Sequence, residues 1–573
     1  MMKQQLTLVA INAKYSHTSL SIRSLRSYLV AQGMEAPCCV ECTINDPYPV
    51  ILERILQAGG DLIGLSCYIW NAQLVKQLSF DIKALQPEKK LFIGGPEVSF
   101  RGQDAFSEYA ADMMIKGEGE LPLFQYLQGE PPETIRGIMT PLYDNGLAEN
   151  VPLKEIPFVY GEDELEKFQN RAVYYETTRG CPFRCSFCIS SLSDGVRALP
   201  MERIKKELQL FIDKKIRRVK LVDRTFNYDR KRAYEIFQYI IDHSKETCIH
   251  FEVGADLFDE QTLCLLKTAP SGIIQFEAGV QTTNPETSRL IYRTHSLEKL
   301  KRNVGMLKQC NIRLHLDLIA GLPKENMQSF YRSFDDIYRL EPDILQLGFL
   351  KMLYGSKIRK EADLFHYIYR KEPPYEVLKN DCLSFSELMR LKDMEEAVEI
   401  YHNSRSFVSA LQYVFRENEI RPSVFFDAAG QALKREGKVG FKEQFVLLGR
   451  IYRALDLKKS DDFLEHLKYD YVQKNRGSLP GCFANFKSAQ ASKAFFAMLD
   501  KEETVSKYFP WLCKYKPKER KKMVDFELFR FEKEKKLFAF DRKNGIVVDF
   551  SSELMYDDLE FGVFSQCENS VKE

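Results

Sequence analysis

Short apolar runs alternate with amphipathic stretches over the first 140 residues. The runs cover residues 6–11, 38–44, 62–67, 91–93 and 113–115. Between them, apolar positions recur at helical spacing, as in residues 19–32, which end at Gly33, a typical C-terminal helix signal. Continuous apolar strands separated by helices predict a parallel sheet covered on both faces. We therefore expect a doubly wound α/β domain over residues 1–140.

A second alternation follows and predicts a barrel. Its apolar runs cover residues 172–177, 218–222, 249–253, 273–280, 312–319 and 344–349, and its helical patterns cover residues 202–214, 230–243, 297–310 and 329–340. Six such units are too few for a closed eight-stranded barrel, so residues 172–370 should form a partial, TIM-like (β/α)6 barrel. Its mouth should lie at the C-terminal strand ends. The proline-containing, acidic residues 141–171 are expected to link the domains.

Helical patterns prevail from residue 371, and β patterns return near the end. Residues 526–531, 537–541 and 546–550 are strand-like, and Asn544-Gly545 is a strong hairpin signal. We expect a mainly helical domain over residues 371–573 that ends in a β-hairpin. We also expect it to cover the barrel mouth.

Composition narrows the class of protein. The 573 residues are 45% hydrophobic and 28% charged, as in soluble globular proteins. A net charge of +1 does not give the protein an overall positive electrostatic potential that would attract nucleic acid, so a nucleic-acid partner is not expected. No apolar run approaches the roughly 20 residues that span a bilayer, and the N-terminus lacks signal-peptide features. Fourteen cysteines without a secretion signal favour reduced thiols in the cytoplasm.

Three cysteines carry the main chemical signal. Cys181, Cys185 and Cys188 are spaced C-x-x-x-C-x-x-C on one short loop, with Phe187 before the last. Thiolates suit zinc or iron–sulfur. Structural zinc and ordinary iron–sulfur clusters take four ligands, so three cysteines leave one iron of a [4Fe–4S] cluster open. Structural zinc and unrelated core cysteines are the alternatives.

The motif resembles that of the radical S-adenosylmethionine (SAM) enzymes. The resemblance implies that the amino and carboxylate groups of SAM chelate the open iron. One electron then cleaves SAM to methionine and a 5′-deoxyadenosyl radical. It also implies an electron donor such as flavodoxin or ferredoxin.

Polar residues at later strand ends resemble the subgroup that includes the coproporphyrinogen oxidase-like enzymes. By that resemblance, Glu252 accepts the ribose hydroxyls, and Gln281 and Arg293 meet the methionine carboxylate. Asp317 lines the SAM pocket, and Gly321 lets the backbone pass near adenine. Each residue alone is also explained by a solvated or capping role, but their order at successive strand ends favours SAM.

One departure from that subgroup concerns the second strand. The Gly-Gly-Glu run common there is replaced by residues 223–227, Asp-Arg-Thr-Phe-Asn. The contact with the amino group of SAM is therefore left unassigned.

The N-terminal loops resemble the Rossmann-like cobalamin-binding domain fused to many radical SAM enzymes. Residues 371–573 resemble the uncharacterised C-terminal extension of one bacterial branch of these proteins. The resemblance implies that cobalamin contacts the strand-end residues Ser66, Tyr68, Gly94, Gly95, Glu118 and Gly119. The Asp-x-His-x-x-Gly motif that supplies a cobalt-binding histidine is absent, although His17 lies in the first loop. We expect the lower cobalt face near Tyr68 or Trp70. A purely structural domain is the alternative.

These features predict a cobalamin-dependent radical SAM enzyme. It would modify an unactivated carbon of a small molecule, by methylation or by ring formation or rearrangement. A radical SAM enzyme without cobalamin, such as a methylthiotransferase, is a second hypothesis, although Cys38, Cys39, Cys42 and Cys67 do not match the extra cluster cysteines of that subfamily. A non-catalytic metal-binding protein is the third.

Overall fold

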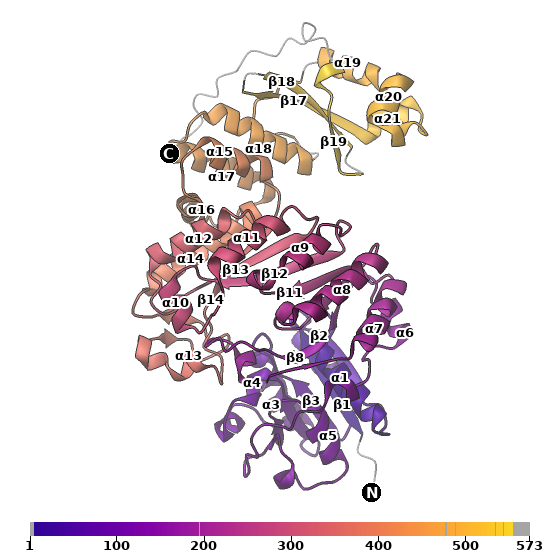
Figure 1. Cartoon of the computed structure of the whole chain (residues 1–573), viewed down its shortest axis with the longest axis vertical. Coiled ribbons are helices and arrows are strands. Elements are labelled where there is room, and N and C mark those ends of the chain that lie inside the picture. The colour runs from indigo at the N-terminus through magenta and orange to yellow at the C-terminus, as the bar shows by residue number, and fades with distance from the viewer. Residues whose placement is uncertain are drawn as a thin grey trace. The chain divides into compact units, whose positions relative to one another are not determined.

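The computed structural model describes residues 5–193, 195–475, 478–487, 489–532, 534–541 and 544–553. The chain forms two compact units, one up to Leu388 and one from Met389 (Figure 1). The first unit contains two six-stranded sheets, and the second contains helices and a three-stranded sheet. Within this described part of the chain, every helix is too short or too polar to span a lipid bilayer.

The N-terminal sheet has the strand order β2-β1-β3-β4-β5-β6, and its first five strands are parallel. The strands are β1 (Leu6–Asn12), β2 (Cys38–Thr43), β3 (Leu62–Ser66), β4 (Lys90–Gly94), β5 (Met113–Ile115) and β6 (Ile138–Met139). The helices are α1 (Leu20–Ala31), α2 (Tyr48–Ala58), α3 (Ala72–Leu85), α4 (Pro96–Ser99) and α5 (Glu120–Leu127). This arrangement confirms the predicted doubly wound domain.

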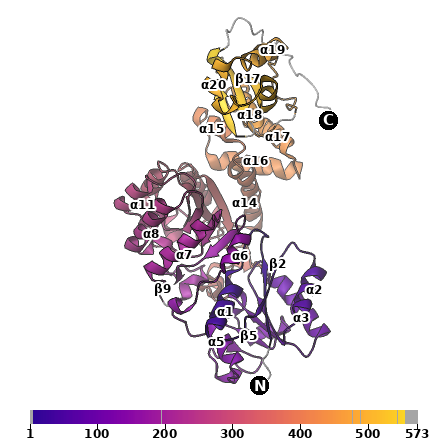
Figure 2. The same ribbon diagram turned by 90° about the vertical axis from the view of Figure 1, so that its right-hand side faces the viewer.

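Alternate residues of each strand build separate cores on the two faces of this sheet. Val9 and Ile11 pack in one core with residues of α2 and α3, whereas Leu8 and Ala10 pack in the other with residues of α1 and α5. Figure 2 shows the two pairs of helices on opposite sides of the strands. Because both faces are covered, the strands read as continuous apolar runs in the sequence.

Two features of this region were not predicted. The short strand β6 pairs antiparallel with β5 at the edge of the sheet. The predicted linker contains a helix, α6 (Glu162–Lys167), whose first turn holds three acidic residues. Acidic residues there are favourable because they face the positive end of the helix dipole.

The second sheet is the predicted open barrel wall. Its order is β14-β13-β12-β11-β10-β7, with all neighbours parallel. The strands are β7 (Ala172–Tyr175), β10 (Arg218–Leu221), β11 (Cys248–Glu252), β12 (Ile274–Gln281), β13 (Arg313–Ala320) and β14 (Ile344–Phe349). The helices are α7 (Met201–Asp213), α8 (Arg230–His243), α9 (Glu260–Leu266), α10 (Pro285–Leu290), α11 (Leu297–Leu307), α12 (Met327–Tyr338) and α13 (Lys357–Lys360). All six predicted strands are present.

The barrel wall has one apolar and one polar face. Along β12 and β13, buried residues such as Phe276 and Leu316 alternate with partly exposed ones such as Glu277 and Asp317. Successive side chains of a strand point to opposite faces. The polar set therefore lines the lumen, while the apolar set packs outward against the helices. Closed barrels instead fill this interior with branched apolar side chains.

A small hairpin interrupts the barrel after its first strand. The strands β8 (Thr178–Gly180) and β9 (Val196–Ala198) pair antiparallel, and the loop between them carries the three cysteines. We call residues 178–198 the cluster hairpin. A second short pair, β15 (Ile368–Tyr369) and β16 (Val377–Lys379), follows the barrel.

The second unit is helical before it turns to strands, as predicted. Its sheet has the order β17-β18-β19, and β18 and β19 form the expected hairpin around Asn544-Gly545. Arg542 and Lys543, in the predicted turn, lie outside the described residues. The strands are β17 (Val524–Phe531), β18 (Glu534–Asp541) and β19 (Ile546–Asp549). The helices, of which the first begins in unit one, are α14 (Phe385–Ala397), α15 (Val408–Glu417), α16 (Pro422–Glu436), α17 (Phe441–Ala454), α18 (Ser460–Lys474), α19 (Ala489–Met498), α20 (Glu502–Tyr508) and α21 (Pro517–Met523). The expected covering of the barrel mouth by this unit stays a prediction.

Candidate active site at the barrel mouth

The cluster hairpin is tightly closed at its base. Gly180 has φ +97°, and a Cβ atom built on it would lie 2.1 Å from the carbonyl oxygen of Gly195. Only glycine fits so close a backbone crossing. Above it, the backbone N–H of Cys181 donates to Ser193 Oγ at 3.1 Å, and that of Cys188 donates to the Cys185 carbonyl at 3.1 Å. These bonds fix the loop that presents the thiols.

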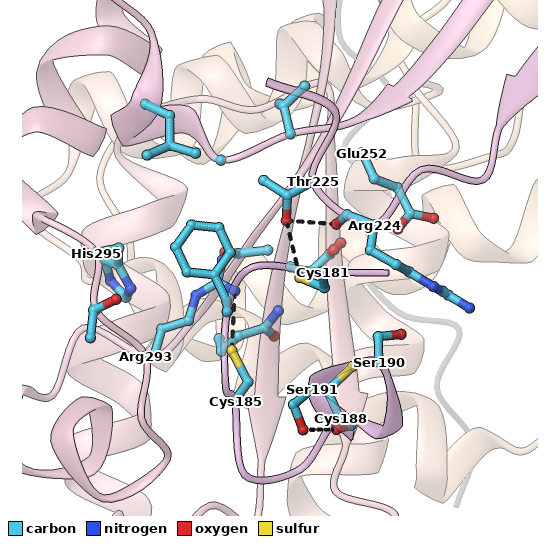
Figure 3. Close-up of a pocket in the computed structure, with 18 of the residues that line it drawn as sticks. Cys181, Cys185, Cys188, Ser190, Ser191, Arg224, Thr225, Glu252, Arg293 and His295 are labelled. Carbon is cyan, nitrogen blue, oxygen red and sulfur yellow. Dashed lines mark hydrogen bonds between the residues drawn. The ribbon is translucent and has the colours of Figure 1, made fainter. Parts of the chain in front are cut away.

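The three cysteines border a cavity of about 180 Å³ at the C-terminal strand ends (Figure 3). Four side chains predicted from the sequence to contact SAM also line it, namely Glu252, Gln281, Arg293 and Asp317, as does Phe187 of the cysteine motif. They come from the cluster hairpin, β11, β12, the segment before α11, and β13. The structure therefore brings together residues that span 137 positions of the chain, from Cys181 to Asp317.

Arg293 connects the cysteine loop to the barrel wall. One of its terminal nitrogens lies 3.7 Å from Cys185 Sγ, and the other donates to the carbonyl of Gly279 on β12. Burial raises the pKa of the Cys185 thiol, and the Arg293 charge opposes that rise. A guanidinium beside a cysteine favours the thiolate, which is the metal-binding form.

Several buried polar atoms of the cavity make no hydrogen bond to the described part of the chain. Among them are Gln281 Oε1, Arg293 Nε and His295 Nδ1. Gln281 also has φ +72°, at an irregularity in the pairing of β12 with β13. Buried polar groups are nearly always paired, so unpaired ones that line a cavity indicate a polar ligand. The three thiols and these atoms together fit a cluster with a bound amino-acid-bearing cofactor.

The carboxylates of the cavity differ in charge state. Burial raises the pKa of Glu252 to about 7, against the opposing charge of Arg224. Burial also opposes ionisation of Glu277, but the hydrogen bond from His250 and the charge of Lys220 hold its pKa at about 2. Glu252 is thus the group of this pair that titrates near neutral pH.

Two of the carboxylates that line the cavity, Glu277 and Asp317, flank an imidazole. His315 lies with Nδ1 3.8 Å from Glu277 Oε2 and with Nε2 3.0 Å from Asp317 Oδ1. Burial lowers the pKa of His315, but the two carboxylates raise it overall. Glu277, His315 and Asp317 are close enough to share a cation. However, each imidazole nitrogen faces a different carboxylate, so the group is better described as a bridged pair of carboxylates.

Sequence reasoning missed part of the cavity wall. Thr225 lies with Oγ1 3.8 Å from Cys181 Sγ, and Arg224 and His295 also line the cavity. Both Arg224 and Thr225 belong to the unusual run 223–227, and that departure from the common pattern was the available signal. The flanking Asp223 and Asn227 are structural: Asp223 accepts from Thr177 N at 2.8 Å, and Asn227 exchanges two hydrogen bonds with Gly254.

Gly321, the remaining residue assigned to SAM, is not placed at the cavity. It has φ +90°, and a Cβ there would face Leu350, Leu388 and Val377. Its carbonyl accepts from the Tyr367 hydroxyl at 2.9 Å. In this structure it shapes the turn after β13.

The strand ends of the N-terminal sheet gather the residues assigned to cobalamin. The rings of Tyr68 and Trp70 stack at 4.3 Å, and Trp70 is 46% exposed. The backbone carbonyl of Ser66 accepts a hydrogen bond from Asn71 Nδ2 at 3.0 Å. The backbone carbonyl of Gly94 accepts one from the Cys67 N–H at 2.7 Å. Gly95 has φ +117°, and a Cβ there would lie 2.5 Å from the Cys67 carbonyl oxygen. A stacked aromatic pair with one exposed ring, beside glycine backbone, fits a large planar cofactor.

Glu118 and Gly119 have protein partners. The Glu118 carboxylate pairs with Arg179 at 2.9 Å and with Arg197. A Cβ on Gly119 would lie 3.1 Å from a methyl group of Leu25. Both residues therefore have a structural explanation in addition to the predicted one. His17, in the first loop, lies with Nδ1 3.1 Å from the Tyr174 hydroxyl.

Comparison with known families divides the chain in three. Residues 6–126 match the B12 binding domain, residues 175–337 match the Radical SAM superfamily, and residues 363–548 match a family described as "Protein of unknown function (DUF4080)". The first match spans the five parallel strands β1 to β5, and the second begins at the last residue of β7 and includes β10 to β13 of the barrel. The cavity lies within the second match.

Individual relatives agree with this division. The chain is 23% identical to an uncharacterized methyltransferase of Pyrococcus horikoshii over 53% of the chain and 69% of the relative. It is 22% identical to the anaerobic magnesium-protoporphyrin IX monomethyl ester cyclase of Rubrivivax gelatinosus, over 77% and 82%. The structure of the cobalamin-dependent SAM radical enzyme OxsB, solved with aqua-cobalamin and SAM, superposes with a TM-score of 0.55 at 15% identity, covering 82% and 79%. At that identity the likeness concerns the fold.

Proposed function

We propose that this chain, a cobalamin-dependent radical SAM enzyme, methylates an unactivated carbon of a small molecule. The observation that carries the proposal is the convergence of three thiols and unpaired polar atoms on one cavity, in a chain that also holds a B12-binding domain. When bound, the cluster, SAM and cobalamin supply the radical and methyl-transfer chemistry, which no side chain can perform.

The protein's own residues hold and orient these groups. Cys181, Cys185 and Cys188 are assigned to the cluster. Arg293 and Gln281 are assigned to the methionine carboxylate, for which a guanidinium is well suited. Glu252 is assigned to the ribose hydroxyls, because an ionised carboxylate accepts hydrogen bonds from hydroxyls. The polar lumen below them supports a substrate with hydrogen-bonding groups, since an apolar one would leave these side chains desolvated and unpaired.

Anaerobic reconstitution tests the assignment. We expect about four irons per chain, as for one four-iron cluster, and 5′-deoxyadenosine on reduction in the presence of SAM. With hydroxocobalamin and SAM carrying a trideuterated methyl group, we expect a labelled methylcobalamin, detected by mass spectrometry. Iron-poor protein, or protein with zinc at the thiols, would refute the cluster. Cluster and deoxyadenosine without labelled methylcobalamin would refute the methyl transfer alone.

Ring formation is the second candidate, because the cyclase relative is matched over most of its length. Methylthio transfer is not supported by the cysteines of the N-terminal sheet. Cys42 packs in one core and Cys39 against the other, on opposite faces of β2, so the two thiols cannot share a cluster.

A radical SAM enzyme also requires a reductant, and we assign this role to a flavodoxin or ferredoxin. The cysteines of the described residues are free thiols, which supports a reducing, cytoplasmic setting. The net charge of +1 gives no support to a nucleic-acid partner. Reduction of the reconstituted cluster by purified flavodoxin, followed by electron paramagnetic resonance, tests the donor.

A further inference from the structure

Two arginines stand directly opposite each other at the base of the cluster hairpin. Arg179 of β8 and Arg197 of β9 are cross-strand partners. Like charges in that position repel. A single carboxylate resolves the conflict: Glu118 accepts from Arg179 through Oε2 at 2.9 Å and from Arg197 through Oε1. Glu118 comes from the loop between β5 and α5, on the N-terminal sheet.

Further charges surround Arg179. Its guanidinium donates to Glu120 at 2.8 Å and to Glu176 at 2.7 Å, and also to Ser24 Oγ at 3.1 Å. The Arg179 side chain is 15% exposed and that of Glu120 is 5% exposed. Because the network is largely shielded from water, its geometry is held more strictly than that of surface ion pairs. Two of its carboxylates, Glu118 and Glu120, belong to the N-terminal domain.

The network joins a residue assigned to cobalamin, Glu118, to two residues of the cluster hairpin. Arg179 is two residues before Cys181 in the sequence. Burial raises the pKa of Tyr68, one of the stacked rings assigned to cobalamin, and Arg179 and Arg224 are among the nearby charges that oppose the rise. Arg224 itself lines the cluster cavity. Any shift of the β5–α5 loop would therefore be transmitted to the base of the hairpin through Glu118.

We propose that Glu118 is a positioning residue that joins the N-terminal strand-end loops to the cluster hairpin, so that cobalamin binding and cluster binding are energetically coupled. The inference rests on the proposed function, because it needs both cofactors to bind. Coupling between two sites is reciprocal: if the cluster tightens cobalamin binding, cobalamin stabilises the cluster by the same factor. Neither consequence involves the catalytic reaction.

The experiment measures the Kd of hydroxocobalamin by its absorbance on the full-length protein, once with the reconstituted cluster and once after removal of iron with a chelator. For the natural sequence we expect the two Kd values to differ by at least about fivefold, the lower end of typical coupling. In Glu118→Gln the ratio should fall toward one, because a neutral amide cannot hold two opposed arginines, although Glu120 and Ser24 still contact Arg179. In Arg197→Gln it should fall to an intermediate value.

Asp144→Asn is the matched control. Asp144, which follows β6, pairs at 2.8 Å with Lys116, two residues from Glu118, and this ion pair includes no residue of the cluster hairpin. This variant should keep the natural ratio. Circular dichroism establishes that each variant is folded, and Arg197→Gln serves if Glu118→Gln is not.

The possible outcomes separate the two proposals. Failure of the natural protein to bind either cofactor refutes the proposed function. Binding of both with a ratio near one, or an unchanged ratio in folded Glu118→Gln and Arg197→Gln, overturns the coupling while leaving the function intact. If the ratio of the two Kd values fell to near one in Asp144→Asn as well, the effect would belong to the β5–α5 loop in general. That result would also overturn the role of Glu118.

Discussion

The two parallel sheets of the first unit present polar residues at the same kind of strand end but use them differently. At the barrel mouth, Gln281, Arg293 and His295 keep buried polar atoms that the described chain does not pair. At the N-terminal sheet, Glu118 is held by two arginines and Glu97 accepts from the Tyr375 hydroxyl. The same topology therefore yields one edge built for small polar ligand groups and one edge braced by the protein itself.

This difference teaches how to read strand-end residues. Polar residues at the ends of parallel strands mark a crevice in both sheets. Only their pairing distinguishes a side chain that contacts a ligand from one that supports a loop. If this is correct, changes at the barrel mouth should affect the binding of the cluster and SAM, whereas changes at the paired carboxylates of the N-terminal edge, Glu97 and Glu118, should affect stability and the coupling between the two domains.

The largest effect is expected at the cysteines. Cys185→Ala removes one of three thiolates, so the variant should hold little iron and form no detectable 5′-deoxyadenosine from SAM, measured by iron analysis and chromatography. Cys264→Ala, which changes an exposed thiol on α9, is the control and should keep both. Full SAM cleavage by Cys185→Ala would show that the cavity is not the cluster site.

Arg293→Gln should weaken SAM binding strongly. A charge-assisted hydrogen bond contributes about 1.5–3 kcal/mol, so its loss raises Kd at least about tenfold. Calorimetric titration of the reconstituted variant with SAM measures the change. Arg289→Gln, four residues earlier and exposed on α10, should bind as the natural protein does. Equal affinities in the two variants would remove Arg293 from the SAM site.

Glu252 should make SAM binding depend on pH. With a pKa of about 7, its carboxyl is about one-tenth ionised at pH 6 and about nine-tenths at pH 8. The ionised form accepts ribose hydroxyls better, so SAM affinity should rise severalfold over this interval. Between the usual glutamate pKa of 4.5 and the pKa of about 7 in the folded protein, Glu252 is protonated in the folded state but ionised in the unfolded state. The contribution of Glu252 to stability therefore falls as the pH rises through this interval. In Glu252→Gln the rise in affinity should be absent, and a rise of the same size would assign the titration to another group.

The smallest effect is expected at the braced edge. Tyr375→Phe removes the hydroxyl that donates to the buried Glu97 carboxylate, which should cost about 1–3 kcal/mol of stability. The midpoint of thermal unfolding should fall by a few degrees, while SAM cleavage should stay unchanged. Tyr143→Phe, with an exposed ring, should not shift the midpoint. A loss of SAM cleavage in Tyr375→Phe without a lower midpoint would contradict the contrast between the two edges.

Most of the fold was predictable because hydrophobic periodicity is strong in buried parallel sheets. All six barrel strands and five N-terminal strands lie where continuous or alternating apolar runs place them. The strand β6 has only two residues, too few for a periodic pattern, and its antiparallel pairing is decided by neighbours distant in sequence. Strands shorter than one or two repeats of the hydrophobic pattern therefore cannot be predicted from that pattern.

The cavity was predictable where a residue type carries the chemistry. The cysteines, Glu252, Gln281, Arg293 and Asp317 all line it. Thr225 and His295 were missed because threonine and histidine at loop positions have many ordinary roles. Gly321 lies elsewhere because the turn after β13 directs it toward Leu350, which only tertiary packing determines. The ion pairs of Glu118 involve residues 61 and 79 positions away, and no local pattern reveals them.

The crossing of Gly180 and Gly195 has a consequence for variation at this site. A single methyl group added at position 180 would collide with the backbone of Gly195 and separate the two strands at the base of the cluster hairpin. Alanine there should loosen all three sulfur atoms at once, although it removes none of them. The ability of this chain to assemble its metal centre thus depends on a residue that contributes no ligand and no side chain.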